Sequence, residues 1–91
     1  MATRQEVYAA IDSERDYQAS RWNPSTTVTG GVHDHVSTWI LYMEDYLAEA
    51  KHILSRTAEQ DAVPQALHII RKVTALGVAC MEQLGAPKRE S

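Results

Sequence analysis

One stretch of this chain decides its fold: Val36-Ser-Thr-Trp-Ile-Leu-Tyr-Met-Glu-Asp-Tyr-Leu-Ala-Glu-Ala-Lys-His-Ile-Leu54. Apolar side chains recur in it at alternating spacings of four and three residues, at Val36, Ile40, Met43, Leu47, Ala50 and Leu54. This period predicts an amphipathic α-helix with that stripe in the core, and Trp39 and Tyr46 widen the stripe. Asp34 is the expected N-cap, and the helix should end near Arg56.

A second helix is predicted before this stretch. It begins at Thr3, which forms a Thr-x-x-Glu capping box with Glu6. It ends at Arg21 or Trp22, because the residue before a proline avoids the α region and Asn23-Pro24 follows. Its expected buried face starts at Val7, Tyr8 and Ile11, and then continues through polar residues, Arg15 and Gln18, to Trp22. Buried polar groups need partners, so this stretch is either an open helix end or the lining of a polar site.

A third helix is predicted after it, with Asp61 as the cap and Pro64 in the first turn. Gly85 supplies its stop signal, with Pro87 just beyond. The expected core stripe is Val63, Leu67, Ile70, Val73 or Thr74, Gly77, Met81 and Leu84. Ala75 and Ala79 lie opposite this stripe, and their small side chains indicate either a contact face between subunits or an exposed alanine face.

The sequence therefore predicts an all-α fold, a three-helix bundle or hairpin that forms a single domain over residues 1–91. A chain this short buries little surface, so a helical homo-oligomer is expected. The net charge of −3 gives no basic footprint for duplex nucleic acid. No apolar run could span a membrane or act as a signal sequence, so a cytoplasmic location is expected. Cys80, the only cysteine, lies in an apolar run and should be a packed core residue.

Two patterns suggest metal ligands, but each has a simpler interpretation. Glu49-x-x-His52 matches half of the motif in di-metal helical bundles, yet these residues face away from the expected stripe and favour a solvated charged face. The segment His33-Asp34-His35 could supply zinc ligands, but one short segment does not complete four-coordination. A helix cap with polar loop residues is the favoured interpretation there.

A set of cationic and aromatic residues remains as the candidate ligand site. Arginine and lysine suit phosphate groups, and tryptophan suits base stacking. The set consists of Arg15, Gln18, Arg21, Trp22, Trp39, Arg71 and Lys72. The alternative is that both tryptophans belong to the core and the cations lie on the surface.

Two motifs resemble the MazG-like all-α nucleoside triphosphate pyrophosphohydrolases. They are Arg15-x-x-Gln18-x-x-Arg21-Trp22 and His35-x-x-x-Trp39, which opens a helix with acidic residues. The run from Arg71 to Glu82 is similar to the third helix of small proteins of this kind found in phages. The resemblance implies a MazG-like fold in which magnesium, held by Glu-x-x-Glu and Glu-x-x-Asp pairs, bridges carboxylates to substrate phosphates.

The chain departs from this family at the metal ligands. Glu44 is followed three residues later by Leu47, and Glu49 is displaced by one position, which rotates a helical side chain by about 100°. Ile69, Ile70, Arg71 and Lys72 stand where the second acidic pair would fall. An incomplete carboxylate set facing two cations should hold Mg²⁺ poorly, whereas the cations attract phosphate directly.

The sequence thus predicts a non-catalytic nucleotide-binding protein with no cofactor. Its ligand would be a nucleotide or cyclic nucleotide, and analogy with phage proteins suggests that it sequesters a host nucleotide immune signal in the host cytoplasm. One alternative is a divergent pyrophosphohydrolase that uses Mg²⁺ at Glu44, Asp45, Glu49 and Glu82. Another is a structural or protein-interaction helical module.

Overall fold

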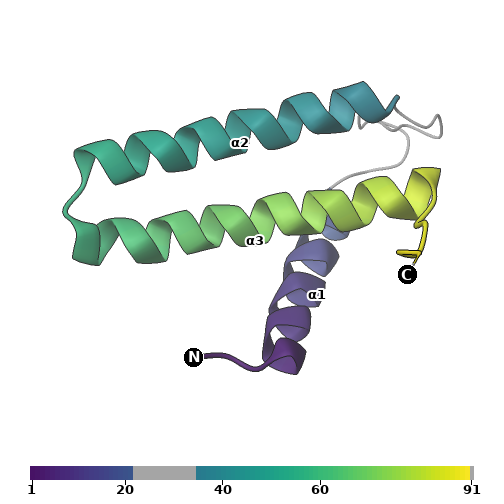
Figure 1. The fold of residues 1–91 in the computed structure, drawn as a ribbon, viewed down its shortest axis with the longest axis horizontal. Coiled ribbons are helices and arrows are strands. Elements are labelled where there is room, and N and C mark those ends of the chain that lie inside the picture. Colours follow the sequence, from purple (N-terminus) through teal and green to yellow (C-terminus); the bar gives the residue numbers. More distant parts are fainter. Residues whose placement is uncertain (22–34, 91) are drawn as a thin grey trace.

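The structure, a computed structural model, describes residues 1–21 and 35–90. In these ranges it has three helices, α1 (Arg4–Arg21), α2 (Val36–Arg56) and α3 (Glu59–Leu84), and no strand. α2 and α3 lie side by side as a long antiparallel hairpin, and α1 crosses α3 steeply and packs against it (Figure 1). The all-α prediction is confirmed for this part of the chain, and the hairpin describes the arrangement better than a bundle.

The start of α1 follows the predicted capping box. The Thr3 backbone N–H donates to Glu6 Oε1, and the Glu6 N–H donates to Thr3 Oγ1, both at 3.1 Å. The hydrogen bond from the Thr3 backbone, and then that from its side chain, hold the pKa of Glu6 below its usual value. α1 ends at Arg21, the first of the two expected positions. Trp22 and Asn23-Pro24 lie outside the described residues.

The N-cap of α2 is His35, one residue after the Asp34 that was predicted. His35 Nδ1 accepts a hydrogen bond from the Ser37 backbone N–H at 3.1 Å, so an imidazole takes the role expected of a carboxylate. Asp34 itself lies outside the described residues, as does His33. The helix ends at Arg56, as predicted.

α3 begins earlier than the sequence predicted. Its first residue is Glu59, and the backbone N–H groups of Asp61 and Ala62 both donate to the Ala58 carbonyl. Asp61 therefore lies in the first turn, where a carboxylate favours the helix dipole, and does not act as the cap. Pro64 falls one turn further into the helix than expected. The predicted stop is confirmed, since Gly85 has φ 119° and donates to the Met81 carbonyl.

The core lies between α2 and α3 and is built around Trp39. Its indole packs with Leu76, Ala79 and Cys80, and Met43 and Tyr46 cover the edge. Trp39 is only 3% exposed. The prediction that Cys80 is a buried core residue is confirmed.

Most of the predicted core stripe lies outside the core. On α3 the buried residues Ala62, Ala66, Ile69 and Cys80 each precede a residue of the predicted stripe, and those residues are exposed. On α2 Met43 and Ala50 are inside, but Val36, Ile40, Leu47 and Leu54 are exposed. The predicted inward face is therefore offset from the observed one by one residue, which is a rotation of about 100° around the helix axis. Both helices carry two apolar stripes, and the inner stripe of α3 includes Ala79, which packs against Trp39.

The alanine face of α3 also differs from the prediction. Ala75 and Ala79 are 0% and 1% exposed within the single chain, so they do not form a free contact face for another subunit. Ala79 belongs to the Trp39 core, and Ala75 lies one turn beyond Arg71, which contacts Glu14 of α1. Among the described helices, none has the length and apolar character needed to cross a membrane.

Candidate functional site at the crossing of α1 and α3

The late turns of α1 rest on α3 through polar side chains. Glu14 and Gln18 are four residues apart, share one face of α1, and are the only buried residues of that helix. Val7 and Tyr8, which the sequence placed on the buried face, are exposed. Helices usually dock through apolar faces, so this polar contact distinguishes the crossing from the rest of the fold.

The most buried ion pair at the crossing joins Arg71 of α3 to Glu14 of α1. Arg71 Nε donates to Glu14 Oε1 at 2.8 Å, and its NH1 lies 2.8 Å from His68 Nδ1. Glu14 is 7% exposed, whereas about a third of the Arg71 side chain remains exposed. Burial strengthens a charge-assisted hydrogen bond of this kind and makes the loss of either partner costly.

A second ion pair joins Arg15 to Glu82. Arg15 Nε donates to Glu82 Oε2 at 2.6 Å, and Arg15 NH2 lies 3.5 Å from Oε1, so the contact is close to bidentate. Half of the Glu82 side chain is exposed, which leaves this pair open to water and ions. Each helix supplies one arginine and one carboxylate, so α1 provides the cation in one pair and the anion in the other.

Gln18 lies between α1 and the α3 backbone. Its Nε2 donates to the Lys72 carbonyl at 3.3 Å. Its Oε1 is buried and accepts no hydrogen bond from any residue of ranges 1–21 and 35–90. A buried acceptor without a donor costs about 1–3 kcal/mol, so this oxygen makes the closed crossing less stable than a fully paired one.

The structure brings four of the seven predicted ligand residues to this crossing: Arg15, Gln18, Arg71 and Lys72. Lys72 also directs its ammonium group toward α2, where Nζ lies 5.8 Å from the centre of the Tyr46 ring. Arg21 lies apart and stacks over Tyr17 on α1.

Of the two tryptophans expected to wall the site, the structure describes Trp39. Trp39 is a core residue, as the alternative interpretation of the tryptophans predicts for it. Trp22 lies outside the described residues. Glu14 is a residue of the crossing that was not predicted, although it shares a face with Gln18 and a cation on another helix was available to pair with it.

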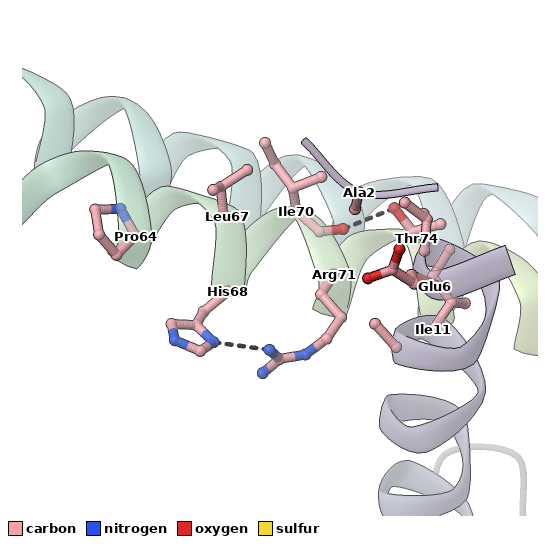
Figure 2. Close-up of a pocket in the computed structure, with 11 residues that line it drawn as sticks. Ala2, Glu6, Ile11, Pro64, Leu67, His68, Ile70, Arg71 and Thr74 are labelled. Atoms are coloured by element: carbon pink, nitrogen blue, oxygen red, sulfur yellow. Dashed lines mark hydrogen bonds between the residues drawn. The ribbon is translucent and has the colours of Figure 1, made fainter. Parts of the chain in front are cut away.

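An apolar groove of about 460 Å³ lies beside the crossing, between the first half of α1 and α3. Val7, Ala10 and Ile11 line it from α1, and Leu67 and Ile70 line it from α3. Figure 2 shows His68 and Arg71 directed toward each other on one side of α3, at the edge of this groove. The groove could therefore hold an apolar group whose polar end reaches the Arg71 guanidinium.

The alternative metal ligands are separated. Glu44, Asp45 and Glu49 are exposed on α2, while Glu82 of α3 is bound by Arg15. Within the described ranges, no three acidic, histidine or cysteine side chains group in a way that could hold a metal ion.

No family model, no curated protein and no solved structure matches this chain.

Proposed function

We propose that this chain binds a nucleotide at the α1–α3 crossing without cleaving it, and that it acts as a helical homo-oligomer. The observation that carries the proposal is the buried Gln18 Oε1, an acceptor with no donor among the described residues, at the crossing that Arg15 and Arg71 also join. Arginines suit phosphate oxygens, and a ribose hydroxyl or a base amino group would donate to Gln18. The ligand class is a nucleotide or cyclic nucleotide.

The absence of cleavage is inferred from the state of the carboxylates. A metal-dependent pyrophosphohydrolase needs acidic side chains free to hold Mg²⁺. Glu14 and Glu82, which lie at the crossing, are each neutralised by an arginine. The divergent pyrophosphohydrolase therefore remains a weaker proposal, and release of pyrophosphate from a nucleoside triphosphate with Mg²⁺ would support it.

Assembly is inferred from the outer stripes of the hairpin. Ile40 and Leu47 directly follow the core residues Trp39 and Tyr46, and the exposed residues of α3 follow core residues in the same way. Because α2 and α3 run antiparallel, the same one-residue offset turns both stripes to one side of the hairpin. This apolar face consists of Val36, Ile40, Leu47, Leu54, Val63, Leu67, Ile70, Met81 and Leu84.

The size of this apolar face suits a second copy of the chain. The α3 stripe is about 30 Å long and each helix about 10 Å wide, so the two helices present about 600 Å². A standard interface buries roughly 800 Å² per partner. Exposed apolar patches of this size usually mark interaction sites. The groove beside α1 adds to the face, because Leu67 and Ile70 line both.

Calorimetry with linear and cyclic nucleotides, in EDTA, tests the binding proposal. We expect at least one nucleotide to bind, and Arg71→Gln to weaken that binding at least about tenfold, because a charge-assisted hydrogen bond is lost. Arg56→Gln is the matched control, since Arg56 carries the same charge at the far end of α2. If no nucleotide binds, the proposal fails.

A protein-interaction module is the second candidate, and one observation favours it. Gln18 donates to a backbone carbonyl, and both crossing arginines have carboxylate partners, as expected if these contacts only hold α1 in place. Assembly without any nucleotide binding would support this candidate. The resemblance to small phage proteins instead supports sequestration of a host nucleotide signal, and this step rests on analogy.

A further inference from the structure

α1 is held on α3 by contacts that an anion could replace. Its buried residues are Glu14 and Gln18, while Val7, Tyr8 and Tyr17 are exposed, so little apolar surface ties α1 to the hairpin. The charged part of the attachment consists of two arginine–carboxylate pairs. Guanidinium groups bind phosphate with the same geometry as carboxylate, so a phosphate competes with Glu14 and Glu82 for the same donors.

The closed arrangement is also incompletely satisfied. Gln18 is 92% buried, being 8% exposed, and its Oε1 accepts no hydrogen bond from the described part of the chain. A ligand cannot reach this oxygen while α1 lies on α3, because the atom is covered. The acceptor becomes available only when α1 moves. The Arg71–Glu14 pair and the covered Gln18 Oε1 therefore both depend on α1 lying against α3.

We propose that Glu14 and Glu82 are internal substitutes for ligand phosphates, so that nucleotide binding displaces them, breaks both ion pairs between α1 and α3 and loosens α1 on α3. This inference rests on the proposed function, because it describes how the same site is controlled. α1 acts as an autoinhibitory arm. Affinity is set by the competition between the carboxylates of the chain and the phosphates of the ligand.

Hydrogen exchange of the α1 amides reports loosening of the arm. Most helical stability in proteins comes from tertiary packing, so α1 should lose protection once its ion pairs with α3 are broken. We use inorganic tripolyphosphate and ATP as probes, in EDTA. In the unmodified protein, saturating probe should accelerate exchange across α1 at least about fivefold, while α2 and α3 exchange as before. This measurement needs no variant and does not depend on the folding of one.

A double variant tests the competition directly. Glu14→Gln with Glu82→Gln removes both carboxylates, and the expected result is a Kd at least about fivefold lower for either probe. The matched control is Asp12→Asn with Asp16→Asn, which makes the same change in net charge on the exposed face of α1. The control should bind as the unmodified protein does, because it leaves both arginine pairs in place.

The outcomes separate this inference from the proposed function. If a probe binds and the α1 amides keep or gain protection from hydrogen exchange, the autoinhibitory role of α1 is refuted, whereas the proposed nucleotide site is supported. A double variant that binds no more tightly than its control also overturns the arm. Absence of binding in both the unmodified protein and a folded double variant overturns the proposed function, and the arm with it.

Discussion

Two neighbouring isoleucines of α3 test which apolar stripe forms the core. Ile69 is 5% exposed and faces the hairpin interior, whereas Ile70 is 49% exposed and belongs to the outer apolar face. We expect Ile69→Ala to destabilise the single chain strongly and Ile70→Ala to leave it nearly unchanged. The periodicity of the sequence alone predicts the reverse order, so the pair separates the two stripes with one chemical change.

The expected magnitudes follow from burial. Replacing a buried isoleucine by alanine costs about 2–5 kcal/mol, because transfer and cavity terms add. Ile70 keeps about half of its surface in water, and full burial of an isoleucine contributes about 1.5–3 kcal/mol, so its truncation should cost about 1 kcal/mol or less. The expected difference between the variants is therefore at least about 1 kcal/mol. Such a difference is resolved in urea melts.

The assay is urea unfolding followed by circular dichroism over a hundredfold range of protein concentration. The loss in Ile69→Ala should appear at every concentration. The loss in Ile70→Ala should be small in dilute protein and grow with concentration, because a partner that covers the apolar face adds stability by mass action. If Ile70→Ala costs as much as Ile69→Ala in dilute protein, the assignment of the core is wrong.

The remaining predictions concern the crossing, the start of α1 and the outer face. Glu14→Gln should lower the free energy of unfolding by about 1–3 kcal/mol, because it breaks a mostly buried ion pair. Glu82→Gln should lower it by less than about 1 kcal/mol, because half of the Glu82 side chain is exposed. Equal losses for the two variants in urea melts would contradict this order. The pKa of Glu6 is lower in the folded chain than in the unfolded one. Its capping bond therefore adds stability at pH values above the usual pKa of glutamate, and this stability is lost as the pH falls through the lowered pKa. Amide NMR shifts at the start of α1 should show this step, and Thr3→Ala should remove it. Gly77→Ala should stabilise the single chain by about 1 kcal/mol in melts of dilute protein, because the added methyl group meets no atom within 4 Å; a loss there argues against an open site.

Much of the local structure could be predicted because its signals are local. The capping box at Thr3, the stop at Gly85 and the end of α2 at Arg56 depend on a few neighbouring residues, and they appear as predicted. The start of α3 was misjudged because Asp61 is as favourable in a first turn as at a cap. Neither position can be excluded without knowing that α2 and α3 are joined by only Thr57-Ala58.

The rotation of the hairpin could not be predicted from period alone. Each helix carries apolar residues at neighbouring positions, such as Trp39 with Ile40 and Ile69 with Ile70. Both stripes have the same 3.6-residue period, so either could face inward. The choice depends on shape, because the Trp39 indole needs small residues such as Ala79 opposite it.

The candidate site was predicted in part for a related reason. Arg15 and Gln18 were recognised because polar residues on an apolar face need partners, and Arg71 because a cation suits phosphate. Arg15 pairs with Glu82 and Arg71 pairs with Glu14, and in both pairs the partners lie far apart in the sequence. A sequence without a structure does not show which of these charges meet. The pairing matters for function, since a free arginine and one bound to a carboxylate present different surfaces to an anion.

The distribution of side-chain size between the two stripes supports assembly. On α3 the inner positions hold many alanines, while the outer ones hold Leu67, Ile70 and Met81. A chain that functioned alone would gain more by burying the larger side chains, since apolar stabilisation scales with the area removed from water. Placing them outside is favourable only if a partner covers them. In the proposed assembly, a short chain with a thin inner core would gain most of its remaining stability from burial of this face against a second copy.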